Sequence, residues 1–166
     1  MSSGISLRFA RIFVMVVAIF ATACGKSKDA AIEDGTGAVH PQDDVRLRLS
    51  STFRCEFPIG VSGNLQRDSP SSTVFREKFS LVFDNVSVPN GTARMIGNNG
   101  GSDIVVSGAD EGITLLEPLE SGFFQMTVIY AAHNSSGSFK AVHSRHSSLM
   151  GWPLPSQYYG SCSAFR

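Results

Sequence analysis

The segment "VRLRLSSTFRCEF", residues 45–57, carries the strongest structural signal in the chain. From position 46 onward the residues alternate with a period of two, so that one side presents Leu47, Leu49, Ser51, Phe53, Cys55 and Phe57. This period is typical of a β-strand with one buried face. The alternation therefore predicts a long strand over residues 45–57, with Cys55 on its buried face between two phenylalanines.

Further segments rich in β-forming residues follow, and Gly, Asn, Asp and Pro stand between most of them. They cover residues 74–83, 92–97, 103–108, 112–119, 122–132, 137–146 and 156–162. After the N-terminal region the only expected helical structure is a single turn over residues 147–152. We predict an all-β domain of about eight strands in one antiparallel meander, closed as a small barrel, with a two-sheet sandwich as the alternative.

The N-terminus has the order of an export signal: basic residues, an apolar run, small residues and a cysteine. Arg8 and Arg11 precede the apolar residues 12–21, and small residues 21–23 precede Cys24. At about a dozen residues the apolar run is shorter than the roughly 20 that a membrane-spanning helix needs. We therefore expect a signal peptide over residues 1–23.

The residues "ATAC", 21–24, resemble the lipobox of bacterial lipoproteins. The resemblance implies cleavage after Ala23 and attachment of acyl chains such as palmitate to Cys24. Several chains, at about 0.8 kcal/mol per buried CH₂, would hold a domain on a bilayer. Gly25 stands where aspartate would resemble an inner-membrane retention signal, so the expected location is the outer membrane, facing the periplasm. The alternative is an ordinary secretory signal that leaves a soluble periplasmic or secreted protein.

The composition after Cys24 predicts a tether and then one domain. Residues 24–44 contain few large apolar side chains and are expected to be the lipidated cysteine and a flexible linker, with the folded domain over residues 45–166. The chain has 14 Lys and Arg against 14 Asp and Glu, and removal of Arg8 and Arg11 leaves 12 against 14, a formal charge of −2. Nucleic acid is not an expected partner, because phosphate binding requires clustered basic residues.

Two cysteines remain if Cys24 is lipidated. An even pair in an exported chain predicts a disulfide between Cys55 and Cys162, whereas two free buried thiols, or a bond from Cys24 to one of the others, are the alternatives. A bond between the first and last strands would bring them together, as a closed barrel requires. The domain also resembles short exported bacterial proteins with an early "F-x-C-x-F" strand and a final "Y-G-x-C", here Phe53, Cys55 and Phe57, then Tyr159, Gly160 and Cys162. The expected shape is similar to that of small ligand-binding barrels such as lipocalins.

The segment "AVHSRH", residues 141–146, holds the best candidate binding residues. If Phe139 and Ala141 face inward, His143 and Arg145 follow on the same face near the end of the strand, where a cation could receive a polar or anionic ligand group. Tyr130 and Tyr158 are the aromatic residues expected to join them. In the alternative register Val142 faces inward, and His143 and Arg145 are solvated at the rim.

Metal binding and catalysis are not predicted. His143 and His146 are three residues apart, and on a strand they would face opposite sides and could not share a zinc ion. The sequence contains no nucleophile elbow and no spaced pair of acids. We therefore expect no catalytic residues and no cofactor.

Three hypotheses for the function follow. The protein is a monomeric, membrane-anchored barrel that binds a small apolar or amphipathic ligand, or a structural or protein-interaction module of the cell envelope with a solid core. The third hypothesis, a hydrolase or metal enzyme, ranks well below these two.

Overall fold

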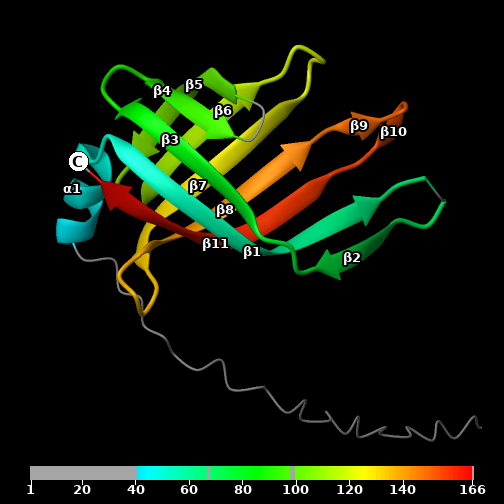
Figure 1. Cartoon of the computed structure of the whole chain (residues 1–166), viewed down its shortest axis with the longest axis horizontal. Coiled ribbons are helices and arrows are strands. Elements are labelled where there is room, and N and C mark those ends of the chain that lie inside the picture. Colours follow the sequence, from blue (N-terminus) through cyan, green and yellow to red (C-terminus); the bar gives the residue numbers. More distant parts are fainter. Residues whose placement is uncertain (1–40, 67, 98–99, 166) are drawn as a thin grey trace, which may run out of the picture. The chain divides into compact units, whose positions relative to one another are not determined.

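Eight antiparallel strands close into a barrel in the computed structural model, which describes residues 41–66, 68–97 and 100–165. The predicted signal peptide, Cys24 and residues 24–40 of the predicted tether lie outside the described residues. The barrel strands are β1 (Thr52–Asn64), β3 (Phe79–Ser87), β4 (Thr92–Gly97), β5 (Gly100–Ala109), β6 (Gly112–Pro118), β7 (Phe124–His133), β8 (Phe139–His146) and β11 (Ser156–Phe165). Each pairs with the next, and β11 pairs with β1, so the predicted closed meander is confirmed (Figure 1).

Residues 41–49 form helix α1 (Pro41–Leu49), so the predicted strand start at residue 45 is wrong and the last residues of the predicted tether, 41–44, are helical. The helix has Asp43 and Asp44 in its first turn and basic residues in its last turn, which matches the helix dipole. Arg48 Nε donates to Asp44 Oδ1 at 2.8 Å, one helical turn away. Within residues 45–49 the alternation is between charged and apolar residues, and of the three apolar residues there only Leu47 is buried.

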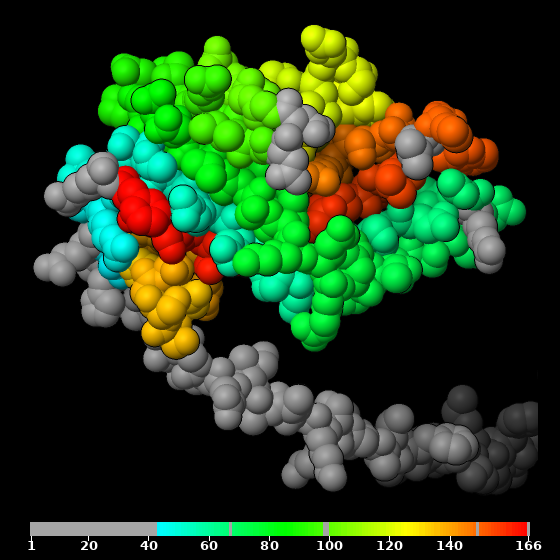
Figure 2. Space-filling view, viewed as in Figure 1, coloured from blue at the N-terminus to red at the C-terminus, as the bar shows by residue number. Residues whose placement is uncertain are grey.

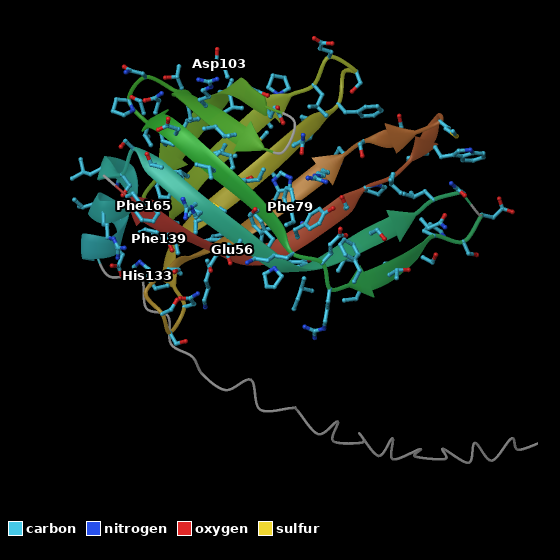
Figure 3. All side chains as sticks on the ribbon, in the orientation of Figure 1. Glu56, Phe79, Asp103, His133, Phe139 and Phe165 are labelled. Carbon is cyan, nitrogen blue, oxygen red and sulfur yellow. A yellow bond between two sulfur atoms is a disulfide. The ribbon has the colours of Figure 1, made fainter. Side chains whose placement is uncertain are left out.

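Helix α1 covers one end of the barrel, where it contacts β6 and β7. Leu47 joins the barrel core, and Arg48 also pairs with Asp110 in the turn between β5 and β6 at 2.8 Å. Asp43 Oδ2 lies 3.2 Å from His133 Nδ1 at the end of β7, and the ring of His133 packs on Phe139 (Figure 3). This end of the barrel is therefore filled by side chains of the helix and the strands.

The strands extend past the other end of the barrel. Strand β2 (Ser71–Phe75) pairs with residues 60–64 of β1, and a short hairpin of β9 (Ser148–Leu149) and β10 (Trp152–Pro153) joins β8 to β11. Two expectations need correction here. The segment 74–83 is two strands, because β2 ends at Phe75 and β3 begins at Phe79, and the expected helical turn over residues 147–152 is this hairpin.

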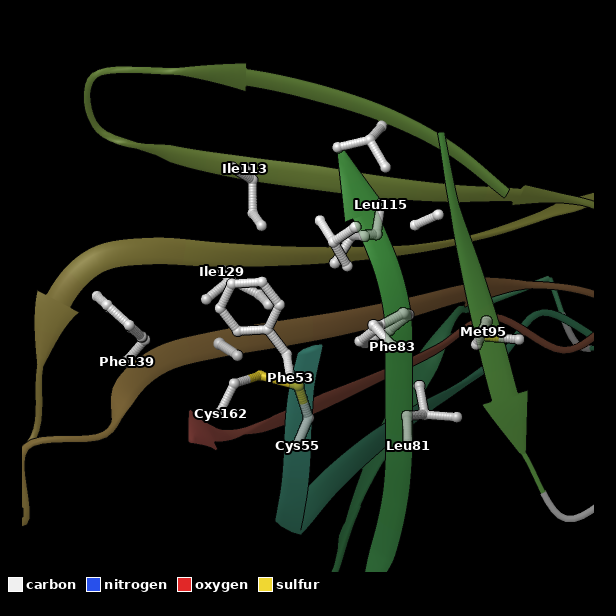
Figure 4. Close-up of a cluster of buried hydrophobic side chains, with 14 of the residues drawn as sticks. Phe53, Cys55, Leu81, Phe83, Met95, Ile113, Leu115, Ile129, Phe139 and Cys162 are labelled. Carbon is white, nitrogen blue, oxygen red and sulfur yellow. A yellow bond between two sulfur atoms is a disulfide. The ribbon is translucent and has the colours of Figure 1, made fainter. Parts of the chain in front are cut away.

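The predicted disulfide is present and joins the two strands that close the barrel. Cys55 and Cys162 lie directly opposite each other in the β1–β11 pair, and 107 positions separate them in the sequence. The bond belongs to the apolar core, where Phe53, Phe139 and Phe83 are among the residues of the same cluster (Figure 4). As predicted, Phe53, Cys55 and Phe57 all face inward and are fully buried.

Gly160 of the "Y-G-x-C" motif stands where the backbone of β1 comes closest to β11. The pairing register between these strands shifts between Glu56 and Ile59, which places a bulge in β1. A Cβ atom at position 160 would lie 1.9 Å from the carbonyl oxygen of Glu56. Only glycine avoids this clash, so close packing of the two strands explains the glycine at this position of the motif.

Candidate ligand-binding site

A cavity of about 510 Å³ opens at the barrel end opposite α1. Its apolar lining includes Phe79 and Leu81 from β3 and Met95 from β4, and its polar lining includes Glu117, Gln125 and Arg145 from β6, β7 and β8. In the space-filling view, orange and red atoms of β8 and β11 lie in a recess bordered by green and yellow strands (Figure 2). The cavity is thus amphipathic, with its apolar and polar surfaces on different strands.

The polar wall is a row across three neighbouring strands. Glu117 of β6 is opposite Gln125 of β7, and Gln125 is opposite Arg145 of β8. Gln125 Nε2 donates to Glu117 Oε2 at 2.8 Å, and Glu117 is buried although it is acidic. Because side chains on a strand alternate between faces, these three residues face inward with the buried apolar positions of the same strands.

A second polar row lies beneath the first. Thr127 of β7 is opposite His143 of β8, and His143 is opposite Tyr158 of β11. The next layer below this row is apolar and contains Ile129 and Ala141. These two polar rows therefore lie near the open end of the barrel, whereas the His133–Asp43 pair lies at the α1 end.

His143 is buried and neutral. Its side chain is 1 % exposed, and burial together with the charge of Arg145 lowers its pKa from 6.5 to about 3. Arg145 Nε donates to His143 Nε2 at 3.2 Å, and an arginine cannot accept a hydrogen bond. His143 therefore carries its proton on Nδ1, which donates to Thr127 Oγ1 at 2.8 Å.

Arg145 is held by aromatic rings rather than by an acid. Its guanidinium carbon lies 4.3 Å from the ring centre of Phe79 and 5.0 Å from that of Tyr158, distances at which cations attract aromatic rings. Nη1 also donates to the hydroxyl of Tyr158 at 3.3 Å. Phe79 lies between β3 and the strands β8 and β11 in the stick view (Figure 3). These contacts orient the guanidinium in the cavity wall.

The structure brings together three of the four residues predicted as a site. His143 and Arg145 face inward with Phe139 and Ala141, so β8 adopts the first of the two predicted registers, and Tyr158 joins them. Tyr130 does not, because it is 42 % exposed on the outer face and pairs with Gly112 near the α1 end. His146 is also exposed, and its ring packs on Phe124. Among the described side chains, no group of three His, Cys, Asp or Glu is arranged to hold a metal ion.

Sequence reasoning missed the other half of the polar wall. Glu117 follows Ile113 and Leu115 at a spacing of two, and Gln125 precedes Thr127 and Ile129 in the same way. This shared parity would have placed both side chains inside the barrel. It could not have shown that they stand beside Arg145, because that depends on the register between strands.

Comparison with known proteins found no similar protein. The chain matches no protein family, no curated protein and no solved structure. Within the described ranges, no helix has the length and apolar character needed to cross a membrane. The fold and the site define the class, a small closed antiparallel barrel with a disulfide at its seam and a hollow, amphipathic mouth.

Proposed function

We propose that the protein is a lipid-anchored protein of the bacterial outer membrane whose barrel binds a small amphipathic molecule in the mouth cavity. The supporting observation is the asymmetry of the interior, which is packed at the α1 end and hollow at the other. A volume of about 510 Å³ suits a small molecule, since such sites typically measure about 300–1,000 Å³. In this proposal the apolar wall takes the apolar part of the ligand and the polar wall orients its head.

The anchor in this proposal is Cys24, which lies outside the described residues and stays a prediction from the lipobox resemblance. The short stretch between Cys24 and the start of α1 at residue 41 would keep the barrel close to the membrane surface. A protein so placed is suited to hold or pass on molecules of the envelope.

The proposal is tested by native mass spectrometry of the full chain extracted from the membranes of its host. A stoichiometric small molecule on an acylated protein would support both parts of the proposal. The matched variants are Ser102→Phe, which fills the cavity, and Ser107→Phe, which places the same ring on the exposed outer face of the same strand. Loss of the molecule from the first variant alone would assign it to the cavity.

The same variants can be tested with 8-anilinonaphthalene-1-sulfonate, an amphipathic anion that fluoresces in apolar sites. We expect saturable binding to the wild type and to Ser107→Phe, and loss of binding in Ser102→Phe. Equal binding by all three proteins would place the dye elsewhere. An extracted protein that carries no molecule and binds no dye would refute the binding function.

The second candidate is a protein-interaction module of the envelope, favoured by apolar side chains exposed at the cavity end. Phe123 lies just before β7, and Phe124 is its first residue. The β9–β10 hairpin contributes Met150 in its turn, Trp152 in β10 and Leu154 just after β10. All five side chains are exposed. Contiguous exposed apolar patches are typical of interaction surfaces, so this candidate requires the five side chains to form one patch. A wild-type protein that is empty but crosslinks to one envelope protein through this hairpin would favour the second candidate.

A further inference from the structure

The cavity wall contains two opposite charges that do not pair with each other. Glu117 and Arg145 lie in one row, separated by Gln125. In the part of the chain that the structure describes, neither of them takes part in an ion pair. Buried or half-buried charges in proteins are normally paired, so this arrangement requires an explanation.

The barrel holds the two charges apart. Neighbouring strands are about 4.8 Å apart, which separates the backbones of β6 and β8 by roughly 10 Å. Gln125 fills the space between them and uses its amide nitrogen to bind Glu117. Arg145 does not reach toward Glu117, because its guanidinium contacts Phe79, Tyr158 and His143.

Both charged groups keep capacity for a ligand. Glu117 is 8 % exposed and lines the cavity, and Gln125 occupies only one of its two carboxylate oxygens. Arg145 uses Nε and Nη1 in its contacts with His143 and Tyr158, and Nη2 makes no hydrogen bond to the described residues. One wall thus offers a carboxylate and a guanidinium with a neutral amide between them.

We infer that the cavity takes a small zwitterion that also carries an apolar group, and this inference rests on the proposed binding function. The anionic group of the ligand pairs with Arg145, and its ammonium group pairs with Glu117. The apolar group lies against the apolar part of the lining, Phe79, Leu81 and Met95. Such a ligand supplies the missing partner of each charge at once, which a purely anionic or purely apolar molecule cannot do.

Two sources share this chemistry, an amino acid with an apolar side chain and the phosphoethanolamine headgroup of a lipid. In both, an ammonium group lies a few bonds from a carboxylate or a phosphate. The inferred site recognises this shared pair of charges, and the arms of the experiment distinguish the two sources.

The experiment measures the affinity of the full-length protein for matched probes by calorimetry. The amino-acid arm compares L-phenylalanine with its amide, which is only cationic, and with its N-acetyl derivative, which is only anionic. The lipid arm compares lysophosphatidylethanolamine, a zwitterion, with lysophosphatidylglycerol, which is only anionic. In one of the arms we expect the zwitterion to bind at least about tenfold more tightly than its singly charged analogues, because a hydrogen bond to a charged group contributes about that much.

Two variants assign the charges to their partners. Glu117→Gln is expected to lower the affinity for the zwitterion about tenfold and to leave that for the anionic analogue unchanged. Arg145→Gln is expected to weaken both. Glu56→Gln and Lys140→Gln are the matched controls, since they remove the same charges from the exposed outer faces of β1 and β8. Thermal unfolding of each variant shows whether it is folded, and the comparison of probes on the wild type does not depend on any variant.

The outcomes separate this inference from the proposed function. If probes bind but in neither arm the zwitterion binds more tightly than its anionic analogue, the barrel is a binding protein but the inference is wrong. If Glu117→Gln binds the zwitterion as well as the wild type does, the inference is also wrong. If no probe of either arm binds and the extracted protein is empty, both fail.

Discussion

Acidification from pH 7 to pH 5 is expected to destabilise the barrel through His143. In the folded protein its pKa is lowered to about 3, whereas in the unfolded chain it has its ordinary value of 6.5. Between these values the unfolded state binds a proton that the folded state does not. The stabilisation is therefore fully present above pH 6.5 and is lost as the pH falls toward 3.

The size of this loss of stability follows from the pKa of His143 in the unfolded chain alone, as long as its pKa in the folded protein stays well below 5. At pH 5 the unfolded histidine is about 1.5 pH units below its pKa, and each unit is worth roughly 1.4 kcal/mol. The free energy of unfolding should therefore be about 2 kcal/mol lower at pH 5 than at pH 7 because of His143.

Urea denaturation at pH 5, 6 and 7, with the disulfide intact, measures this effect. The variant His143→Gln removes the titrating group and keeps a side chain that can hydrogen-bond to Thr127. The control is His146→Gln, which removes a histidine from the exposed outer face of the same strand. We expect the wild type and the control to lose about 2 kcal/mol more than His143→Gln does. The same pH dependence in all three proteins would refute the assignment of a buried, neutral His143.

Three further predictions concern the helix, the seam and the anchor. Leu47→Ala should lower the free energy of unfolding by about 2–5 kcal/mol, because Leu47 is buried. Leu49→Ala, at a position 64 % exposed, should change it by less than about 0.5 kcal/mol. If denaturant titrations gave similar losses for the two variants, residues 45–49 would form a strand instead of α1. Replacing Cys55 and Cys162 together by alanine removes a bond that closes a loop of 107 residues, so the free energy of unfolding in urea should fall by up to about 5 kcal/mol. This double variant should remain in the membrane fraction. A fall of less than about 1 kcal/mol would contradict the view that the bond stabilises the fold by restricting the unfolded chain. Cys24→Ser should move the protein from the membrane fraction to the soluble fraction, and its retention in the membrane would refute the lipid anchor.

The strands of this protein could be predicted where alternation coincides with burial. In β1 the positions 53, 55 and 57 are all buried, and in β8 His143 shares the parity of Phe139 and Ala141 and is buried with them, which is one of the two registers that the sequence left open. Prediction failed at residues 45–49, where the same alternation is present but only Leu47 is buried. There the ion pair within one helical turn and the charges at the helix ends favour a helix, and a short alternating run cannot distinguish the two structures.

The candidate site could be predicted only in part, for a related reason. His143 and Arg145 are neighbours on one strand, so their common face follows from the sequence. Glu117 and Gln125 come from two other strands, and nothing local relates them to Arg145. Tyr130 is expected in the site from the sequence, but its parity in β7 puts it on the outer face.

The sequence by itself determined the local properties of this protein: alternating strands, turns between them, Cys55 on the buried face of the first strand, and His143 and Arg145 on a common face of one strand. These follow from the period of two in a β-strand, which each segment carries in its own residues. Only the tertiary structure decided the barrel closure, the packing of α1 against one end and the row of Glu117, Gln125 and Arg145 at the other. Those features depend on the register between strands, which is set by the joint packing of side chains far apart in the chain.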